Sequence, residues 1–350
     1  GVEGIAGLRA RAGALLGDIV DGQPIVISAP EGATPDMAYA AFTSANSTRN
    51  MVLAGANDGM LHAFKIDGVT DNMTELMGYI PSPVYPRLKA LTAVDYGQSA
   101  GTPHTYHVNG VMKAADFKLD IAGIPTWKTL VVGGLGQGGQ GYYALDATSQ
   151  GQFASATSAV KWEFTDVNDA SMGYTLGAPL LYNVRASSST VTPAVIFANG
   201  YESNWDDTAN GGQKSALKNS ALFILNANTG ALIKKITLPA ASTGLSAPAG
   251  VDVGQDGILD YVYAGDVNGK LWRFDLTDSD PANFKVIATP IFDAGVNQPI
   301  VARPVVLALD KASDASSRGN MVIFGTGKLL TNADRSDTKT QTLYGILDGM

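Results

Sequence analysis

Short apolar runs alternate with glycine-rich turns along the whole chain. The plainest example places residues 261–265 and 270–276, rich in Val, Leu and aromatic residues, on either side of the turn Asp266-Val-Asn-Gly269. Runs of this kind bounded by Gly, Asp and Asn are typical of a β-hairpin. Looser copies pair residues 129–134 with 141–146, 194–199 with 221–226, and 321–327 with 342–347. The pattern predicts an all-β chain built of successive hairpins.

Two of these hairpins share a specific motif. Residues 55–64 and 265–274 both read Gly, two residues, Asp or Asn, Gly, one residue, Leu, an aromatic ring, one residue and Phe. A further apolar run begins at Pro24, Pro179 and Pro304, where a proline at the start of a strand loses no ladder hydrogen bond. One strand plus a hairpin, repeated at roughly 50–70 residues, predicts β-propeller blades, and about six to eight of them would use the whole chain as one domain over 1–350.

Four segments do not follow the repeat. Residues 81–91 are predicted to hold a short helix, and the polar stretches 31–48, 202–220 and 310–320 are predicted to be loop insertions between strands. Loops that connect strands are common places for binding residues, but they also tolerate variation.

Composition narrows the possible partners. The formal net charge is −8, whereas nucleic acids and anionic membranes require concentrated Lys and Arg, so neither is an expected partner. The absence of cysteine excludes disulfides and thiolate metal sites. No apolar run approaches the ~18 residues needed to cross a bilayer as a helix. An acidic, glycine-rich β protein is instead well suited to binding a cation.

The strongest chemical signal is a loop in which Asp252, Asp256 and Asp260 occupy every fourth position. These acids match positions 1, 5 and 9 of an EF-hand loop, Gly257 matches the sharp turn at position 6, and Ile258 at position 7 would offer its backbone carbonyl. Three carboxylates in so short a loop repel one another, and a hard divalent cation relieves the repulsion. The loop is predicted to bind Ca²⁺.

The loop departs from an EF-hand at two positions. Gly254 stands at position 3, where Asp or Asn is usual, and Tyr263 stands at position 12, where an EF-hand has a bidentate Glu. No helices are predicted to flank the loop. The alternative interpretation is an Asp-Gly β-turn with solvated carboxylates.

No constellation for catalysis was found. Residues 134–139 satisfy G-x-G-x-x-G, but a strand-like run follows in place of a helix, which favours a glycine-rich hairpin over a dinucleotide site. On a predicted strand His104 and His107 would point to opposite faces, and His62 is predicted to pack between blades. No G-x-S-x-G element occurs. We therefore expect no catalytic residues and no enzyme.

Several segments together resemble one known family. Residues 9–20, 49–64, 127–148 and 251–276 are similar, in the same order, to the C-terminal domain of the PilY/PilC family of type IV pilus assembly and tip-associated adhesin proteins. The resemblance implies a modified, about seven-bladed, quinoprotein-like β-propeller with loop insertions. It also implies that the chain is the C-terminal part of a longer protein whose N-terminal region is absent.

The resemblance further implies a function. Members act in pilus biogenesis at the outer membrane, cell surface and pilus tip of Gram-negative bacteria, with major or minor pilins and host-surface receptors as partners. Calcium occupancy is linked there to pilus extension against retraction, twitching motility and adhesion. The family's calcium ligands match Asp252, Asp256 and Asp260 and the carbonyl of Ile258, while its remaining polar ligand falls on Gly254.

Two other functions stay open from the residues. Residues 141–148 and 222–230 resemble repeats of quinoprotein-type dehydrogenases, which also bind calcium, but those enzymes generally carry regular tryptophan repeats, and this chain has four scattered Trp. A calcium-braced extracellular scaffold propeller is the second alternative. It would be expected to carry several such loops, and only one strong copy occurs.

Overall fold

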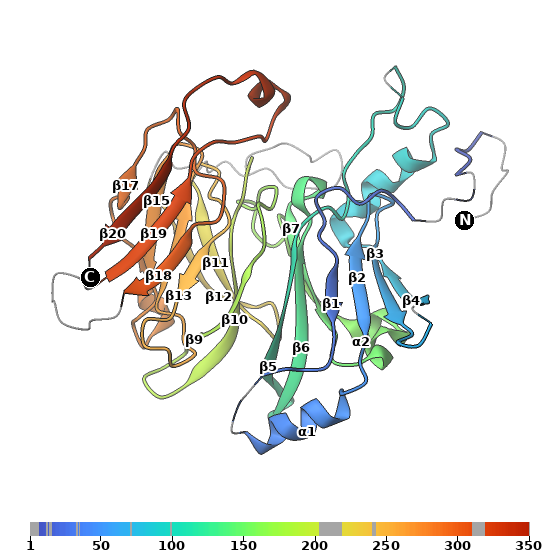
Figure 1. Ribbon diagram of the computed structural model, residues 1–350, viewed down its shortest axis with the longest axis horizontal. Coiled ribbons are helices and arrows are strands. Elements are labelled where there is room, and N and C mark those ends of the chain that lie inside the picture. Colours follow the sequence, from blue (N-terminus) through green and yellow to red (C-terminus); the bar gives the residue numbers. More distant parts are fainter. Residues whose placement is uncertain are drawn as a thin grey trace. The chain divides into compact units, whose positions relative to one another are not determined.

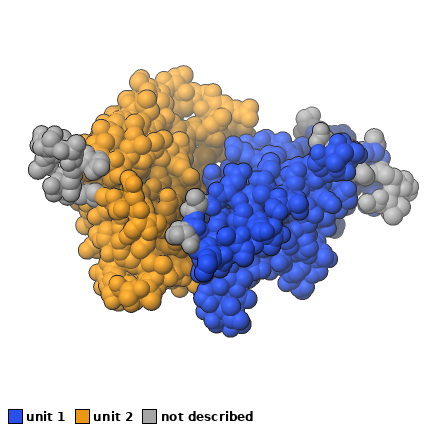
Figure 2. Space-filling model, turned by 60° about the horizontal axis from the view of Figure 1, so that its bottom comes forward, with its two compact units in different colours: residues 1–170, 206–214 blue, residues 171–205, 215–350 orange. Residues whose placement is uncertain are grey.

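The computed structural model describes residues 7–11, 13, 16–32, 34, 36–70, 72–98, 100–202, 219–239, 243–309 and 319–349. Its contacts group into two compact units, residues 1–170 with 206–214 and residues 171–205 with 215–350 (Figure 2). Residues 203–218 and 310–318, which make up most of the predicted insertions 202–220 and 310–320, lie outside the described residues. The single domain over 1–350 stays a prediction, and each unit is described by itself.

Unit 1 contains two antiparallel sheets, each with its four strands in sequence order (Figure 1). The first consists of β1 (Ile25–Ile27), β2 (Met51–Gly55), β3 (Leu61–Ile66) and β4 (Met73–Tyr79), and the second of β5 (Met112–Ile121), β6 (Ile124–Gly134), β7 (Gly141–Asp146) and β8 (Val160–Thr165). Each strand pairs with the next, so each sheet is a four-stranded meander. The β2–β3, β5–β6 and β6–β7 connections are short turns that contain glycine, whereas longer connections lead from β1 to β2 and from β7 to β8.

Unit 2 continues the same order with three more sheets (Figure 1). The first consists of β9 (Leu180–Arg185), β10 (Val191–Ala198), β11 (Ala221–Asn226) and β12 (Leu232–Thr237). The second consists of β13 (Ala249–Val251), β14 (Tyr261–Gly265), β15 (Lys270–Asp275) and β16 (Lys285–Val286), with β17 (Phe292–Asp293) also paired to β15. The third consists of β18 (Val305–Leu309), β19 (Gly319–Gly325) and β20 (Leu343–Asp348). Among the described residues the meander thus recurs in five sheets. The predicted all-β architecture is confirmed.

The helices are short. They are α1 (Met37–Ala45), η1 (Ser82–Thr92), η2 (Gly136–Gly138), η3 (Gln150–Ala154), α2 (Ala156–Ala159), η5 (Pro281–Asn283) and η7 (Asn332–Ser336). The 3₁₀-helix η1 confirms the helix predicted at 81–91, and α1 occupies the predicted insertion 31–48. The G-x-G-x-x-G segment is the β6–β7 turn, as predicted. None of the described helices has the length and apolar character needed to cross a membrane.

Both faces of the central strands are covered. In β11, residues 221–225 are fully buried in succession, and Val195, Ile196 and Phe197 of β10 are buried beside them. A continuous apolar run is what a strand packed on both faces requires. Burial of each large side chain stabilises the fold by about 1.5–3 kcal/mol, so these runs hold the unit together.

Both faces of the sheet β18–β19–β20 carry apolar side chains, but only one face is buried. Val322 and Phe324 point to the covered face and are at most 3% exposed. The register places Leu307 and Leu347 on either side of Met321 on the other face, where the two leucines are 52% and 48% exposed.

The β14–β15 turn gives a test of the packing. Gly269 has φ +82°, and a Cβ there would overlap the carbonyl oxygen of Gly295 and stand 2.8 Å from that of Gln298. Gly295 itself has φ +84°, but a Cβ there would meet nothing within 4 Å. We expect Gly295→Ala to lower the free energy of unfolding by about 1 kcal/mol, from backbone strain alone, and Gly269→Ala by at least about 2 kcal/mol more. Equal losses in urea unfolding would contradict this packing.

Candidate metal centre

The acidic loop connects the first two strands of one sheet. Its ends are closed where Val251 of β13 pairs with Tyr261 of β14 and where the Asp260 N–H donates to the Val251 carbonyl over 3.1 Å. The neighbouring strand β9 also holds it, because the Leu259 N–H donates to the Asn183 carbonyl over 2.9 Å. The loop is therefore hydrogen-bonded to two sheets of unit 2, and only the residues between its ends lie away from them.

Side-chain oxygens of the loop hold its backbone in place. Asp252 accepts hydrogen bonds from the N–H groups of Asp256 (3.2 Å) and Gly257 (2.7 Å), and Asp256 accepts one from Ile258 (2.9 Å). Gly257 has φ +81°, which a glycine adopts without strain. This left-handed turn is the one predicted at EF-hand position 6, and the Gly257 N–H within it donates to the Asp252 carboxylate.

The position of Gly254 lies beside two carboxylates. A Cβ built there would stand 3.7 Å from Cγ of Asp256 and 3.9 Å from Oδ1 of Asp252, with no closer contact. Gly254 does not have a positive φ, so its backbone accepts other residues. The missing side chain thus leaves space next to two acidic groups, where water or a ligand oxygen fits.

Asp260 is in a different environment from the other two acids. It is 7% exposed, its Oδ1 lies 2.9 Å from Nη1 of Arg185 on β9, and its Oδ2 accepts the Val253 N–H over 2.9 Å. The structure thus brings Asp252 and Asp256 together and directs Asp260 to an arginine. Within the described ranges, no group of three or more His, Cys, Asp or Glu is arranged to hold a metal. The oxygen-only donor set fits Ca²⁺ chemically, and ligation by all four predicted positions stays a prediction.

Unit 1 contains a charged cluster that the sequence patterns did not predict. His62 is 4% exposed; its Nδ1 lies 2.6 Å from Oε1 of Glu75 on β4, and its Nε2 lies 3.2 Å from Oδ2 of Asp58 in the β2–β3 turn. As an imidazolium, the ring donates to both carboxylates. Asp58, four residues before His62, could have been identified as its partner from the sequence. Glu75 could not, because it meets the ring only through strand pairing.

The other two histidines do not lie on a strand, so the prediction of opposite strand faces for His104 and His107 was wrong. The His107 N–H donates to the side-chain oxygen of Asn57 in place of a ladder partner. His104 has its Nε2 3.1 Å from the Asp18 carboxylate. Both histidines are thus held by side-chain acceptors and not by pairing with a neighbouring strand.

The three-residue cluster shifts two pKa values in opposite directions. Burial opposes the charged form of His62, but the hydrogen bonds to Asp58 and Glu75 outweigh it, so the pKa of His62 is raised above its ordinary value. Burial also opposes ionisation of Asp58, but the hydrogen bonds from His62 and the Gly17 N–H outweigh it, so the pKa of Asp58 is lowered. Both shifts favour the charged forms of His62 and Asp58.

The four-stranded meanders and the shared hairpin motif define a protein of the β-propeller class. The chain belongs to the PilY1 beta-propeller domain family, whose model matches residues 16–350. The resemblance inferred from the sequence segments is confirmed.

Curated relatives and a solved structure agree with this assignment. The type IV pilus biogenesis factor PilY1 of Pseudomonas aeruginosa (strain UCBPP-PA14) is 33% identical over 388 residues, covering 99% of this chain and 30% of that protein. A PilY1 homolog of Xylella fastidiosa (strain Temecula1) is 34% identical over 352 residues, covering 97% of this chain and 25% of its own length. The crystal structure of the P. aeruginosa PilY1 C-terminal domain matches with a TM-score of 0.65 and 31% identity, over 89% of this chain and 60% of that one. The chain spans less than a third of the length of these curated relatives.

The His62 cluster predicts a pH dependence. Because the folded-state pKa of His62 is raised, its stabilising effect is fully present below the unfolded value near 6.5 and is lost as pH rises through the folded-state value. Replacing Glu75 by Gln removes one carboxylate, so we expect the pKa of His62 to fall. An NMR titration of the His62 ring measures this, with the exposed Glu31→Gln as control. A His62 pKa that is unchanged by Glu75→Gln, or that is lower than that of a free histidine, would contradict the cluster.

Proposed function

We propose that this chain is a calcium-binding β-propeller domain of a type IV pilus biogenesis factor. Family membership supports the pilus role, because the curated relatives are named as type IV pilus biogenesis factors. These names describe assembly and not a catalysed reaction, which favours a non-enzymatic domain over a quinoprotein-type dehydrogenase. The domain would be exported and act at the outer membrane, cell surface and pilus tip, in contact with pilins and host-surface receptors.

The calcium part of the proposal rests on one observation. Two carboxylates, Asp252 and Asp256, stand beside the open position of Gly254 in a loop that turns at Gly257. Bound Ca²⁺ supplies positive charge to this loop. Asp252 and Asp256 would offer carboxylate oxygens and Ile258 its carbonyl, and water would fill the space at Gly254.

Asp260 connects the loop to the sheets. Its carboxylate faces Arg185 of β9, and its carbonyl accepts the N–H of Leu276 over 2.8 Å. A change in the order of the loop therefore reaches two sheets through one residue. We infer that calcium occupancy orders the loop and shifts the domain between pilus-bound states, which would regulate extension against retraction, twitching motility and adhesion.

Calorimetry tests the ligand assignment. We expect the wild-type domain to bind Ca²⁺ with a Kd of roughly 10⁻⁴–10⁻³ M or somewhat tighter, and Asp256→Asn to lose most of the heat. The matched control is Asp278→Asn, because the Asp278 carboxylate also accepts the N–H two residues on, outside the loop. Identical heats for wild type and Asp256→Asn would remove the loop as the calcium site.

Adding a ligand is the complementary test. Gly254→Asp places a carboxylate in open space next to Asp252 and Asp256, at the EF-hand position where an acid is usual. We expect calcium to bind about tenfold tighter and the calcium-free domain to become less stable, because three acids then repel one another. Titration with calcium and urea unfolding in chelator measure the two effects. Weaker calcium binding would show that Gly254 does not face the ion.

The pilus role is tested in cells. The parent protein carrying Ala at Asp252, Asp256 and Asp260 should alter pilus number and twitching in the same direction as a chelator does for the wild type. A wild-type phenotype for this variant, with calcium binding abolished in vitro, would separate the metal from pilus control.

A further inference from the structure

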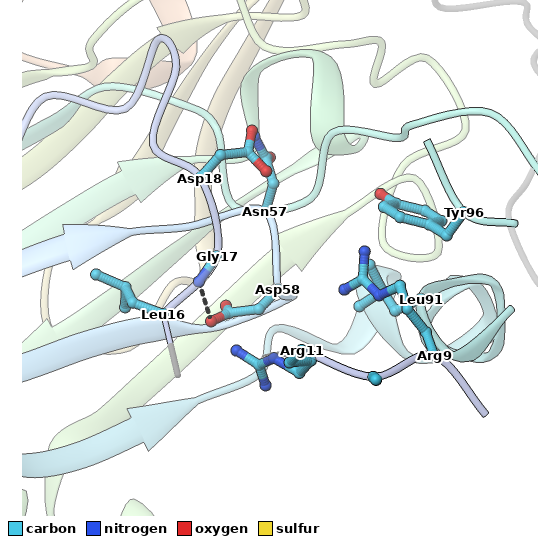
Figure 3. A pocket seen from close by; sticks show the side chains of 10 residues that line it. Arg9, Arg11, Leu16, Gly17, Asp18, Asn57, Asp58, Leu91 and Tyr96 are labelled. Atoms are coloured by element: carbon cyan, nitrogen blue, oxygen red, sulfur yellow. Dashed lines mark hydrogen bonds between the residues drawn. The ribbon is translucent and has the colours of Figure 1, made fainter. Parts of the chain in front are cut away.

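A pocket in unit 1 lies outside both clusters described above. It has a volume of about 270 Å³ and is lined by the N-terminal segment, the β2–β3 turn and the end of η1 (Figure 3). Two arginines, Arg9 and Arg11, and two acids, Asp18 and Asp58, contribute to its lining, and Tyr96 forms one wall. The charge that this small pocket presents to a ligand depends on how these four charged side chains are paired.

Arg9 is the side chain without a matching acceptor. Its guanidinium lies over the Tyr96 ring, with Cζ 4.6 Å from the centroid. Its backbone N–H donates to the Thr92 carbonyl over 3.0 Å, which fixes the main chain at that point. Its Nε is buried and has no hydrogen-bond partner. A buried donor on a cation is costly. Because Nε has no accessible surface, an anion in the pocket would stabilise the guanidinium through its charge and through hydrogen bonds to the terminal nitrogens.

The two acids of the pocket are engaged elsewhere. Asp58 accepts the Gly17 N–H over 2.8 Å and pairs with His62. Asp18 accepts the Asn57 amide over 2.8 Å and lies 3.1 Å from His104. These bonds turn both carboxylates toward their own partners, and neither supplies the acceptor that Nε of Arg9 lacks.

The Tyr96 wall, against which Arg9 lies, is held in place. The Tyr96 hydroxyl accepts the Thr105 N–H over 3.0 Å, and the Tyr96 ring lies 5.9 Å from the ring of His104. His104 is in turn bonded to Asp18. The pocket is thus built before any ligand arrives, which reduces the entropy lost on binding.

We propose that this pocket binds a carboxylate group, with Arg9 as its anchor and Tyr96 as the platform that orients the guanidinium. A planar carboxylate accepts two parallel N–H bonds from a guanidinium fork. The negative charges of Asp18 and Asp58 favour a monoanion over the more highly charged phosphate. The carboxylate comes from an acidic side chain or from the C-terminus of a peptide.

Two probes distinguish these sources. N-acetyl-glutamate N-methylamide carries only a side-chain carboxylate, and N-acetylglycine carries only a terminal one. Each is titrated into the intact 350-residue chain in calcium-free buffer, after the chelator has been removed by dialysis, so that the outcome is independent of the calcium loop. We expect at least one probe to bind saturably, as measured from the NMR chemical shifts of the Tyr96 ring. Inorganic phosphate should bind more weakly.

Substitutions then test the anchor. Arg9→Gln should weaken binding of the probe about tenfold or more, because a charge-assisted hydrogen bond is lost. Arg335→Gln is the matched control, since it removes the same charge at an exposed position and should change nothing. If Arg9→Gln does not fold, Tyr96→Leu removes the platform and should also weaken binding. Equal affinity in the variant that folds, phosphate binding as tight as either probe, or no saturable binding of either probe would overturn the proposal.

Discussion

Carboxylates held inside turns are the interaction on which this structure depends. The clearest is Asp266 at the β14–β15 turn, which is fully buried and accepts hydrogen bonds from the N–H groups of Asn268 and Lys270 and from the ring of Trp272. Those bonds fix where one strand ends and the next begins. Burial raises the pKa of Asp266, and the three donors oppose that shift. A carboxylate without such donors would destabilise so deep a turn.

The turns differ in how the negative charge is compensated. In the equivalent hairpin of unit 1, Asp58 is paired with His62, which replaces Trp272 in the motif. Asp260 is paired with Arg185. In the β13–β14 loop, by contrast, Asp252 and Asp256 accept only backbone N–H groups and face the open position of Gly254. Two adjacent acids without a cationic side chain are where a divalent cation stabilises most, which is the physical basis of the calcium proposal.

Local sequence patterns predicted the fold well because each hairpin is made of residues that are close together in the sequence. The motif shared by residues 55–64 and 265–274 specifies a turn and two strands, and both hairpins formed as predicted. Contacts between distant residues were not predictable. Arg185 reaches Asp260 because β9 lies beside the loop, and Glu75 reaches His62 across a β-bulge in the β3–β4 pairing. Neither partner is close to the site in sequence, so no spacing rule reveals it.

We propose that calcium orders the loop between Val251 and Asp260. Amide hydrogen exchange of the isolated chain, with and without Ca²⁺, measures this order residue by residue. We expect calcium to slow exchange at Asp256, Gly257 and Ile258, with a smaller effect in β14 and none in the β6–β7 hairpin of unit 1. Unchanged exchange in the loop at millimolar calcium, or protection confined to other parts of the chain, would contradict it.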